Sequence, residues 1–432
     1  MLKNKNYKKI LILIVILALI VRLVYVIKTP YTEKQHDLDL SYILTIYEAG
    51  HLPQSNEGQY YHPPLHQLIG AVFLTIENIF INNMEEDMAG ESLQFLTLIY
   101  SMIILYVIYN IAKEMKLKEK HILYVMFITA LHPTLIILSG SINNDELCVL
   151  LIMWSILRLI KWYKKADMKN TIFLAITTGL AVMTKTNGAI IAIPIIYIFL
   201  LKLYRELRKS KNKFIIIRKY LYLFAIFGII ALPIGLWYNV RNYILFKQPI
   251  LYILDTQNTD LYVGNYSLLQ RFSPFSKEIF KMYCNAFEDY NILTYLIKCS
   301  LFGEFLWDNG KATHIYYTIA IIINIIFTII SLYCIIKNMI TKNKRKKVWK
   351  NTLFLLWITN IISFISMNLK LPYGCSMDFR YIVPTIFVQA IFICFELENI
   401  MRKNNKKEKI IFTYLFELAL ALMLFSDIII LR

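Results

Sequence analysis

The sequence has few cysteines and none of the glycine-rich motifs that bind nucleotides. Its 6 cysteines in 432 residues form no CxxC pair, so their spacing predicts neither a disulfide framework nor a zinc site. No GxGxxG follows a strand-like run and no P-loop occurs, so no nucleotide site is predicted. The inverted internal repeat common in secondary transporters is also missing.

Hydrophobic residues are what the sequence has in excess. They make up 57% of the chain, and the mean hydropathy is +0.51, whereas soluble domains are roughly 45–50% apolar. Apolar runs of about 17–25 residues are long enough to cross a bilayer as helices. We therefore predict an all-α polytopic membrane protein with about eleven transmembrane helices, at residues 10–27, 92–112, 121–139, 146–163, 171–186, 188–204, 219–240, 315–337, 351–367, 379–398 and 410–431.

Acidic residues are scarce beside basic ones, since 29 Asp and Glu stand against 47 Lys and Arg. With the N-terminus in the cytoplasm, 33 of these 47 basic residues fall in segments predicted to be inside, as the positive-inside rule requires. The charge therefore indicates orientation and not nucleic-acid binding. We predict a multi-pass cell-membrane protein in contact with lipids, and the abundance of Ile, Lys, Asn and Tyr favours a bacterial plasma membrane.

This topology gives a single membrane domain, 1–432, with a first external loop at 28–91 and a long external loop at 241–314. Residues 38–49 have the apolar periodicity of an amphipathic helix on the membrane surface. The apolar part of 66–82 is too short to span, so we predict a second surface helix there. Both external loops are expected to cover the outer ends of the spans.

Two histidines lie in a constrained stretch of the first loop. Pro63 and Pro64 in "YYHPP" exclude a helix interior, so we predict an extended, rigid segment that fixes His62 and His66 near the bilayer surface. The long loop contains another amphipathic pattern at 276–290, which predicts a helix.

Ionisable side chains at the outer ends of spans are candidates for function because charges at membrane depth are costly. Asp145 opens a span, where helix capping is the alternative explanation. Lys185 lies between two spans, where it would otherwise reach to the surface. Arg241 ends one span, and Arg380 begins another beside Asp378, a neighbouring acid with which it could simply pair. Three cations at the outer side suit a ligand that carries a phosphate.

These motifs, in this order, resemble the GT-C superfamily of membrane glycosyltransferases. The likeness is greatest to the group that contains protein O-mannosyltransferases and aminoarabinose transferases (glycosyltransferase family 39-like), and it runs from about residue 10 to 395. The motifs that carry it are "HD" at 36–37, "HPPLHQ", "NNDELCVLL", "TKTNG", "RNYILFKQP" and "DFRYIVP".

The resemblance implies a GT-C architecture and transfer of a sugar, for example the hexose mannose, from a polyprenyl-phosphate carrier on the outer face. The acceptor hydroxyl would belong to a protein, a lipid or a wall glycan. Asp37 would be the catalytic base, and because Leu38 follows it where the family often has Glu, Asp39 remains open for that role. The implied catalytic residues are Asp37, Asp39, His62 and Asp145, and the implied carrier-phosphate contacts are Lys185, Arg241 and Arg380.

Some relatives bind a divalent metal, and the candidates for it are His36, His62 and His66. Direct displacement with inversion is expected, because no second carboxylate is placed as a nucleophile. A competing interpretation is a transporter or flippase of a lipid-linked sugar, but this would favour internal repeats or charges near the bilayer midplane. A structural scaffold is a third interpretation, and it leaves Lys185 and Arg380 unexplained.

Overall fold

The computed structural model describes residues 4–32, 39–81, 85–250, 252, 261–274, 276–282, 289–304, 311–341 and 346–401. Within these ranges the chain forms α-helices and four short 3-10 helices, and its only strand-like pairing is an isolated bridge between Tyr262 and Tyr373. The predicted all-α fold is confirmed. His36, Asp37 and the predicted span at 410–431 lie outside the described residues.

Six helical segments are long and apolar enough to cross a membrane, and a bent pair that includes α15 (Pro384–Ile400) makes a seventh, with a bend of 44°. Every predicted span within the described ranges coincides with helical structure, but the count of eleven is not confirmed. The six segments are α1 (Asn4–Lys28), α4 (Glu86–Glu114), α9 (Ala192–Lys209) with the preceding η1 (Thr186–Ile191), α10 (Lys213–Phe246), α13 (Lys311–Ile340) and α14 (Lys347–Lys370).

Three predicted spans form shorter or more polar helices than expected. The one at 121–139 is divided into α5 (Glu119–Leu131) and α6 (Pro133–Leu138), because proline lacks an N–H and restricts the residue before it. Next along the chain, α7 (Asp145–Lys164) begins with two acidic residues, and α8 (Met168–Thr184) has only 17 residues.

The described residues belong to two compact units. Unit 1 comprises 1–36, 117–141 and 255–432, and unit 2 comprises 37–116 and 142–254. In unit 1, α1 packs on α5, while α5, α13 and α14 pack around α15, whose side chains are almost all buried.

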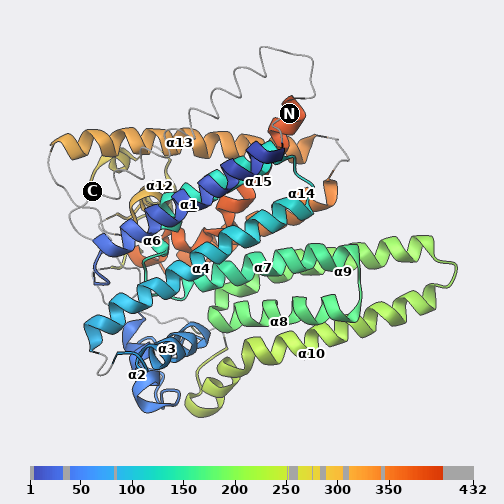
Figure 1. Cartoon of the computed structure of the whole chain (residues 1–432), viewed down its shortest axis with the longest axis horizontal. Helices are drawn as coiled ribbons and strands as arrows, with labels where there is room; N and C mark the ends of the chain where they lie inside the picture. Colours follow the sequence, from blue (N-terminus) through green and yellow to red (C-terminus); the bar gives the residue numbers. More distant parts are fainter. Residues whose placement is uncertain are drawn as a thin grey trace. The chain divides into compact units, whose positions relative to one another are not determined.

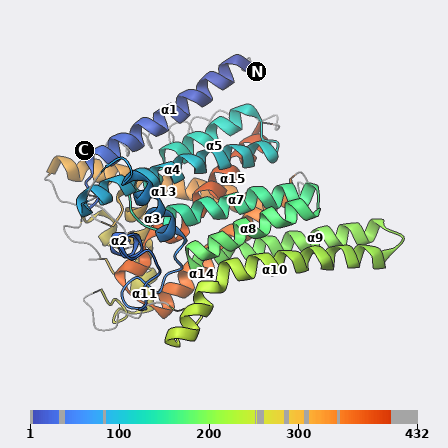
Figure 2. The same cartoon turned by 60° about the horizontal axis from the view of Figure 1, so that its bottom comes forward.

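Unit 2 is built on close packing of α8 against α7 and α10 (Figure 1). Glycines allow this approach, since a Cβ added at Gly179 would lie 2.8 Å from Ile234, and one at Gly235 would lie 3.0 Å from Val182. Figures 1 and 2 both show α9 and α10 forming a hairpin that extends past the ends of α7 and α8.

The segment predicted as the first external loop, 28–91, contributes α2 (Leu40–Ala49) and α3 (Leu65–Glu77), which pack against each other in unit 2. A Cβ at Gly70 would lie 3.0 Å from Ile43, so glycine permits the close contact. At 13 residues α3 is too short to span, and Val72 and Ile76 on it remain more than half exposed. Both features agree with a helix that lies in the membrane surface.

Two local predictions need correction. In "YYHPP" the chain does not run extended throughout, because the N–H groups of Tyr60 and His62 close turns onto Glu57 and Gln59, helped by Gly58 at a φ of +54°. In the long loop, the described part of 276–290 forms only the 3-10 helix η2 (Lys277–Phe280). The apolar helix α12 (Ile292–Phe302) and the short α11 (Leu268–Phe272) were not predicted.

Candidate functional site

A buried ion pair joins the start of α7 to the end of α8. The ammonium group of Lys185 donates to Oδ1 of Asp145 at 2.6 Å, and the two side chains are 10% and 5% exposed. The chain turns tightly just after Lys185, where a Cβ at Gly188 would lie 2.3 Å from the carbonyl oxygen of Ala181. This turn keeps Lys185 at the end of α8 and directs its amine to Asp145.

The two residues of this pair had different alternative explanations in the sequence, helix capping for Asp145 and reach to the surface for Lys185. Capping does not account for Asp145, because it is the first helical residue and its carboxylate binds an amine. Reaching to the surface does not account for Lys185, which is buried. An ion pair this deep in protein is costly to form and costly to break, because each charge loses its water.

The surface helix α3 adds two buried polar side chains to the same unit. His66 is 0% exposed, and neither of its ring nitrogens makes a hydrogen bond. Burial lowers the pKa of His66 to about 4, although the carboxylate of Asp145 acts in the opposite direction, so the imidazole is neutral near pH 7. Gln67 is also fully buried without a hydrogen bond at either amide atom. Such groups are rare in cores, and their donors and acceptors are available to a polar ligand.

Asp39 lies at the other edge of this polar group. Its side chain is almost completely buried just before α2. Its backbone N–H donates to the carbonyl of Ile142 at 3.0 Å, which ties the start of α2 to the residues that lead into Asp145. Asp39, Asp145, Lys185, His66 and Gln67 are called here the polar centre of unit 2. Asp37, two residues before Asp39, is outside the described residues.

The first external loop is fastened to α10 beside this centre by a cluster that we call the loop clamp, formed by Tyr42, Pro53, Tyr60, Tyr238 and Arg241. The hydroxyl of Tyr238 donates to the carbonyl of Tyr60 at 2.5 Å and lies 2.9 Å from the hydroxyl of Tyr42. One arm of the Arg241 guanidinium donates to the carbonyl of Pro53 at 2.7 Å. The clamp therefore holds both halves of the loop on one helix.

Arg241 also differs from the other predicted phosphate contacts, Lys185 and Arg380, each of which lies beside a carboxylate. Its second arm donates to Oδ1 of Asn242 at 2.9 Å, and its plane lies 5.4 Å from the ring of Tyr238. It forms no ion pair with any residue that the structure describes. Among the described residues of unit 2, no carboxylate therefore pairs with this guanidinium.

In unit 1, Arg380 is 2% exposed and lies 3.5 Å from a carboxylate oxygen of Glu304. Its backbone N–H donates to Oδ1 of Asp378 at 2.8 Å, so the expected contact with Asp378 exists through the backbone. Both acidic residues are buried. Arg380 thus lies in a polar cluster at the bend before α15.

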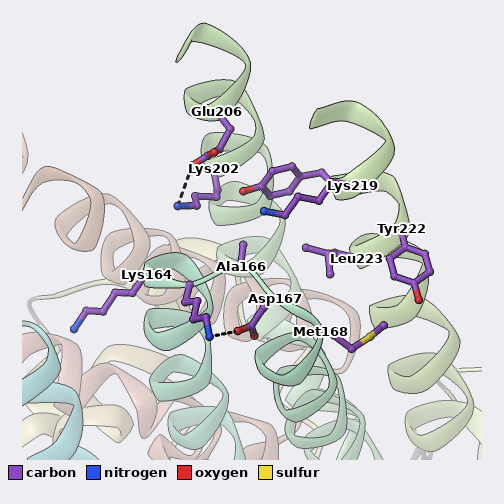
Figure 3. A pocket seen from close by; sticks show the side chains of 11 residues that line it. Lys164, Ala166, Asp167, Met168, Lys202, Glu206, Lys219, Tyr222 and Leu223 are labelled. Atoms are coloured by element: carbon purple, nitrogen blue, oxygen red, sulfur yellow. Dashed lines mark ion pairs between the residues drawn. The ribbon is translucent and has the colours of Figure 1, made fainter. Parts of the chain in front are cut away.

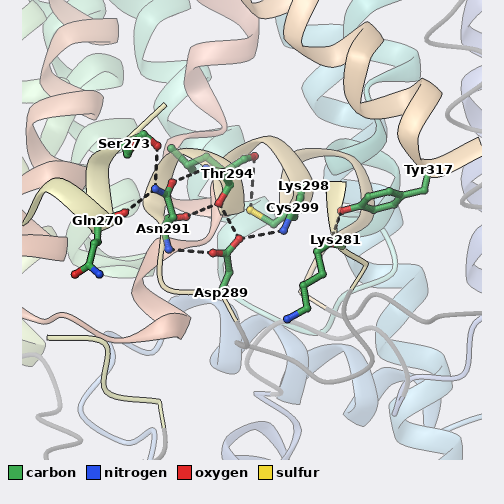
Figure 4. A network of polar contacts seen from close by, with 10 residues as sticks. Gln270, Ser273, Lys281, Asp289, Asn291, Thr294, Lys298, Cys299 and Tyr317 are labelled. Carbon is green, nitrogen blue, oxygen red and sulfur yellow. Dashed lines mark hydrogen bonds and ion pairs between the residues drawn. The ribbon is translucent and has the colours of Figure 1, made fainter. Parts of the chain in front are cut away.

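The long external loop has its own buried network in unit 1 (Figure 4). Lys298 on α12 lies 3.1 Å from Oδ2 of Asp289, and that oxygen also accepts from the hydroxyl of Thr294 at 2.8 Å. The side-chain amide of Asn291 donates to two loop carbonyls, those of Gln270 and Ser273. These bonds fasten α12 to the preceding loop.

The predicted histidine metal site is only partly described. His62 is half-buried and stacks against Tyr61 with ring centroids 4.0 Å apart, His66 is buried, and His36 is outside the described ranges. Within those ranges no three His, Cys, Asp or Glu side chains lie close enough to hold a metal ion.

Sequence reasoning found most members of the polar centre but missed Gln67 and the tyrosines of the clamp. The signal for Gln67 was present, because it directly follows His66 in "HPPLHQ". Tyr42 and Tyr238 carried no signal, since the chain has 30 tyrosines and nothing local distinguishes these two.

Comparisons with known proteins found a matching family model and solved structures of similar fold. Residues 61–237, which contain most of the polar centre, match the family model described as dolichyl-phosphate-mannose-protein mannosyltransferase. No individual curated protein matches the sequence significantly.

Two solved membrane proteins are similar in fold. The Archaeoglobus fulgidus oligosaccharyltransferase AglB, in complex with an inhibitory peptide and a dolichol-phosphate, is 13% identical with a TM-score of 0.52, over 98% of this chain and 55% of that protein. ArnT from Cupriavidus metallidurans, bound to undecaprenyl phosphate, is 11% identical with a TM-score of 0.52, over 97% of this chain and 75% of that one. This chain thus spans about half the length of the archaeal protein. The predicted resemblance to the GT-C superfamily is confirmed.

Proposed function

We propose that this chain, which has the GT-C fold, is a glycosyltransferase that moves a sugar from a polyprenyl-phosphate carrier to an acceptor hydroxyl. The observation that carries the proposal is the polar centre of unit 2, where the buried Asp145–Lys185 pair lies within the segment that matches the mannosyltransferase model. The carriers named in the two solved relatives, dolichol-phosphate and undecaprenyl phosphate, support a lipid-linked donor.

The proposed sugar is a hexose such as mannose, and the preferred acceptor is a protein hydroxyl. The description of the family model names a mannose donor and a protein acceptor, and an AglB structure carries a tethered acceptor peptide. A lipid or a wall glycan is the alternative acceptor.

In the proposed reaction Asp37 takes the proton of the acceptor hydroxyl while the oxygen attacks the anomeric carbon. The bond from that carbon to the phosphate oxygen breaks, the lipid phosphate leaves with the electron pair, and the configuration inverts. A positioned base typically contributes about 10²–10⁴-fold to such a step. Asp39, buried beside the polar centre, is the alternative base.

The three cations are proposed to have different roles, which depend on whether a carboxylate pairs with each of them. A departing phosphate is stabilised best by positive charge that no carboxylate already neutralises. Arg241 meets this condition in unit 2, because its described contacts are with neutral oxygens. Lys185 and Arg380 remain proposed phosphate contacts, with Asp145 and Glu304 as the carboxylates that orient them.

The polar centre is proposed to face outward from a bacterial plasma membrane. Single-cysteine labelling of intact cells tests this, with cysteines introduced at His62 for the outer side and at Lys344 for the cytoplasmic side. The reagent should label the first position and leave the second unlabelled. The opposite pattern would overturn the topology.

The decisive experiment uses the full chain, purified in detergent, with radiolabelled mannose on undecaprenyl phosphate and a serine- and threonine-containing peptide. Transfer of label to the peptide is expected, and a nucleotide sugar alone should give none. The transporter interpretation makes a different prediction, which is movement of the lipid-linked sugar across a proteoliposome membrane without transfer. That result would replace the enzymatic proposal.

A further inference from the structure

A basic pocket lies at the far end of unit 2 from the polar centre (Figure 3). It has a volume of about 500 Å³ and is formed by the α7–α8 connection together with α9 and α10. Ligand sites commonly have about 300–1,000 Å³. The helix α8 separates it from Lys185 by 17 residues, which at about 1.5 Å per residue is roughly 25 Å. The pocket is therefore separate from the candidate functional site.

The pocket carries an excess of positive charge. Four lysines line it, namely Lys164, Lys165, Lys202 and Lys219, against the two acids Asp167 and Glu206. Both acids are already engaged, since Asp167 lies 3.0 Å from the amine of Lys165, and Glu206 lies 3.3 Å from the amine of Lys202. Asp167 also caps α8 by accepting from the N–H of Asn170 at 2.9 Å.

Lys219 is the lysine whose charge is not compensated. It forms no ion pair within the described part of the chain, and its amine lies 5.4 Å from the ring of Tyr220. Figure 3 shows Lys219 on α10 and Lys202 on α9 in the upper part of the pocket, with the Lys202 amine turned toward Glu206. Two neighbouring amines that extend from different helices suit a small anion with several oxygens, such as a phosphate.

One wall of the pocket is apolar and faces outward from the helices. Tyr222 and Met168 line it and are 57% and 38% exposed, and Leu221 beside them on α10 is 59% exposed. Helix surfaces of this kind, on spans long enough to cross a membrane, are covered by lipid tails. A ligand whose phosphate occupies the pocket can thus place an acyl chain along α10.

We propose that this pocket binds the phosphate headgroup of an anionic phospholipid from the leaflet on its own side, with Lys219 and Lys202 as the phosphate contacts. The connections that form it are among those predicted to be cytoplasmic, and anionic lipids attract basic residues on that face. The site anchors the α9–α10 hairpin to the bilayer.

The test is native mass spectrometry of the full chain in detergent, titrated with phosphatidylglycerol or phosphatidylcholine. The wild type should retain phosphatidylglycerol more strongly. Lys219→Gln should weaken that binding about fivefold, whereas Lys219→Arg should retain it. Lys209→Gln is the matched control, because Lys209 is an exposed lysine of the same hairpin that does not line the pocket.

Three results would overturn the proposal. The first is equal binding of the two lipids, and the second is an equal loss in Lys219→Gln and Lys209→Gln, which would indicate only diffuse surface charge. The third is displacement of phosphatidylglycerol by inorganic phosphate at equal concentration, which would make the pocket a site for soluble anions. Unchanged thermal unfolding of Lys219→Gln in detergent excludes misfolding as the cause of lost binding.

Discussion

The described part of the chain contains two buried aspartate–lysine pairs, one in each unit, and their surroundings differ. In unit 1, Asp289 pairs with Lys298, only nine positions along the chain, and its two oxygens also accept from the backbone of Asn291 and the hydroxyl of Thr294. In unit 2, Asp145 and Lys185 lie 40 positions apart at the ends of two helices. Near this second pair, His66 is buried without hydrogen bonds at its ring nitrogens.

These surroundings assign different roles to the two ion pairs. The pair in unit 1 holds a loop in place, whereas the pair in unit 2 belongs to the polar centre. The acceptors of Asp289 are occupied by groups of the same loop, so this pair holds the loop to α12 (Figure 4). The pair in unit 2 joins distant segments and has neighbours with free hydrogen-bonding atoms, His66 and Gln67. Chemistry is therefore expected at the second pair, while the first contributes to stability.

The largest expected effect tests whether the first loop, 28–91, supplies the catalytic base. Asp37→Asn keeps the size of the side chain but removes the base, so sugar transfer should fall by at least about 10²-fold while carrier binding survives. Asp39→Asn should cost much less. Transfer of labelled mannose and binding of labelled carrier by each purified variant measure the two quantities. If Asp39→Asn alone abolishes transfer, Asp39 is the base, and if neither matters, the loop has no catalytic role.

How far the sequence predicts this arrangement depends on the kind of interaction. The short apolar run within 66–82 predicted α3 as a surface helix, and the structure gives it 13 residues, too few to span a bilayer. The ion pair between Asp145 and Lys185 could not be predicted, since it depends on how α7 and α8 pack. Nor could the division at His132, where the hydropathy was that of one continuous span and Pro133 alone marked the break.

The sequence predicted most residues of the candidate site. It did not predict which of the cations pair with carboxylates. Sequence motifs pointed to Lys185 and Arg380 first, and to Arg241 after them, as cations that contact phosphate. Only the folded chain pairs two of them with carboxylates, Asp145 and Glu304, and leaves the third on neutral oxygens. Long-range contacts of this kind are set by tertiary packing, which local patterns do not encode.

The second prediction compares the two ion pairs by replacing the lysine of each with methionine. Lys298→Met leaves Asp289 buried without its cation and should lower the free energy of unfolding by about 3–5 kcal/mol. Lys185→Met also leaves a buried Asp145 without its cation and should cost stability, but unlike Lys298→Met it should in addition raise the KM for the carrier in the protein that remains folded. Thermal unfolding in detergent and the KM for the carrier, measured on both variants, give the comparison. Normal donor use in Lys185→Met would contradict the first assignment, and normal stability in Lys298→Met would contradict the second.

A smaller effect is expected at the loop clamp. Arg241→Gln retains hydrogen bonding to Pro53 but removes the uncompensated charge, so the KM for the lipid-linked donor should rise about tenfold, as for loss of a charged hydrogen bond. Arg241→Lys keeps a positive charge and should therefore show a smaller rise in this KM. Tyr42→Phe is the control for a loosened loop, because it removes the hydroxyl contacts with Tyr238 and with the carbonyl of His62 and leaves the charge of Arg241 in place. Equal losses in Arg241→Gln and Tyr42→Phe would assign Arg241 to loop positioning alone.

The smallest effect is a pH dependence of stability that belongs to unit 2. Burial lowers the pKa of His66 from its ordinary 6.5 to about 4, so between these values the unfolded chain binds a proton that the folded chain does not. The free energy of unfolding is then fully retained above pH 6.5 and falls as the pH drops toward 4. His66→Asn should flatten this decline in thermal unfolding curves recorded from pH 7 to 4.5. His51→Asn is the matched control, because His51 is an exposed histidine of the same loop and its substitution should leave the curve unchanged. If His66→Asn retains the full decline, other groups cause it, and burial does not hold His66 neutral.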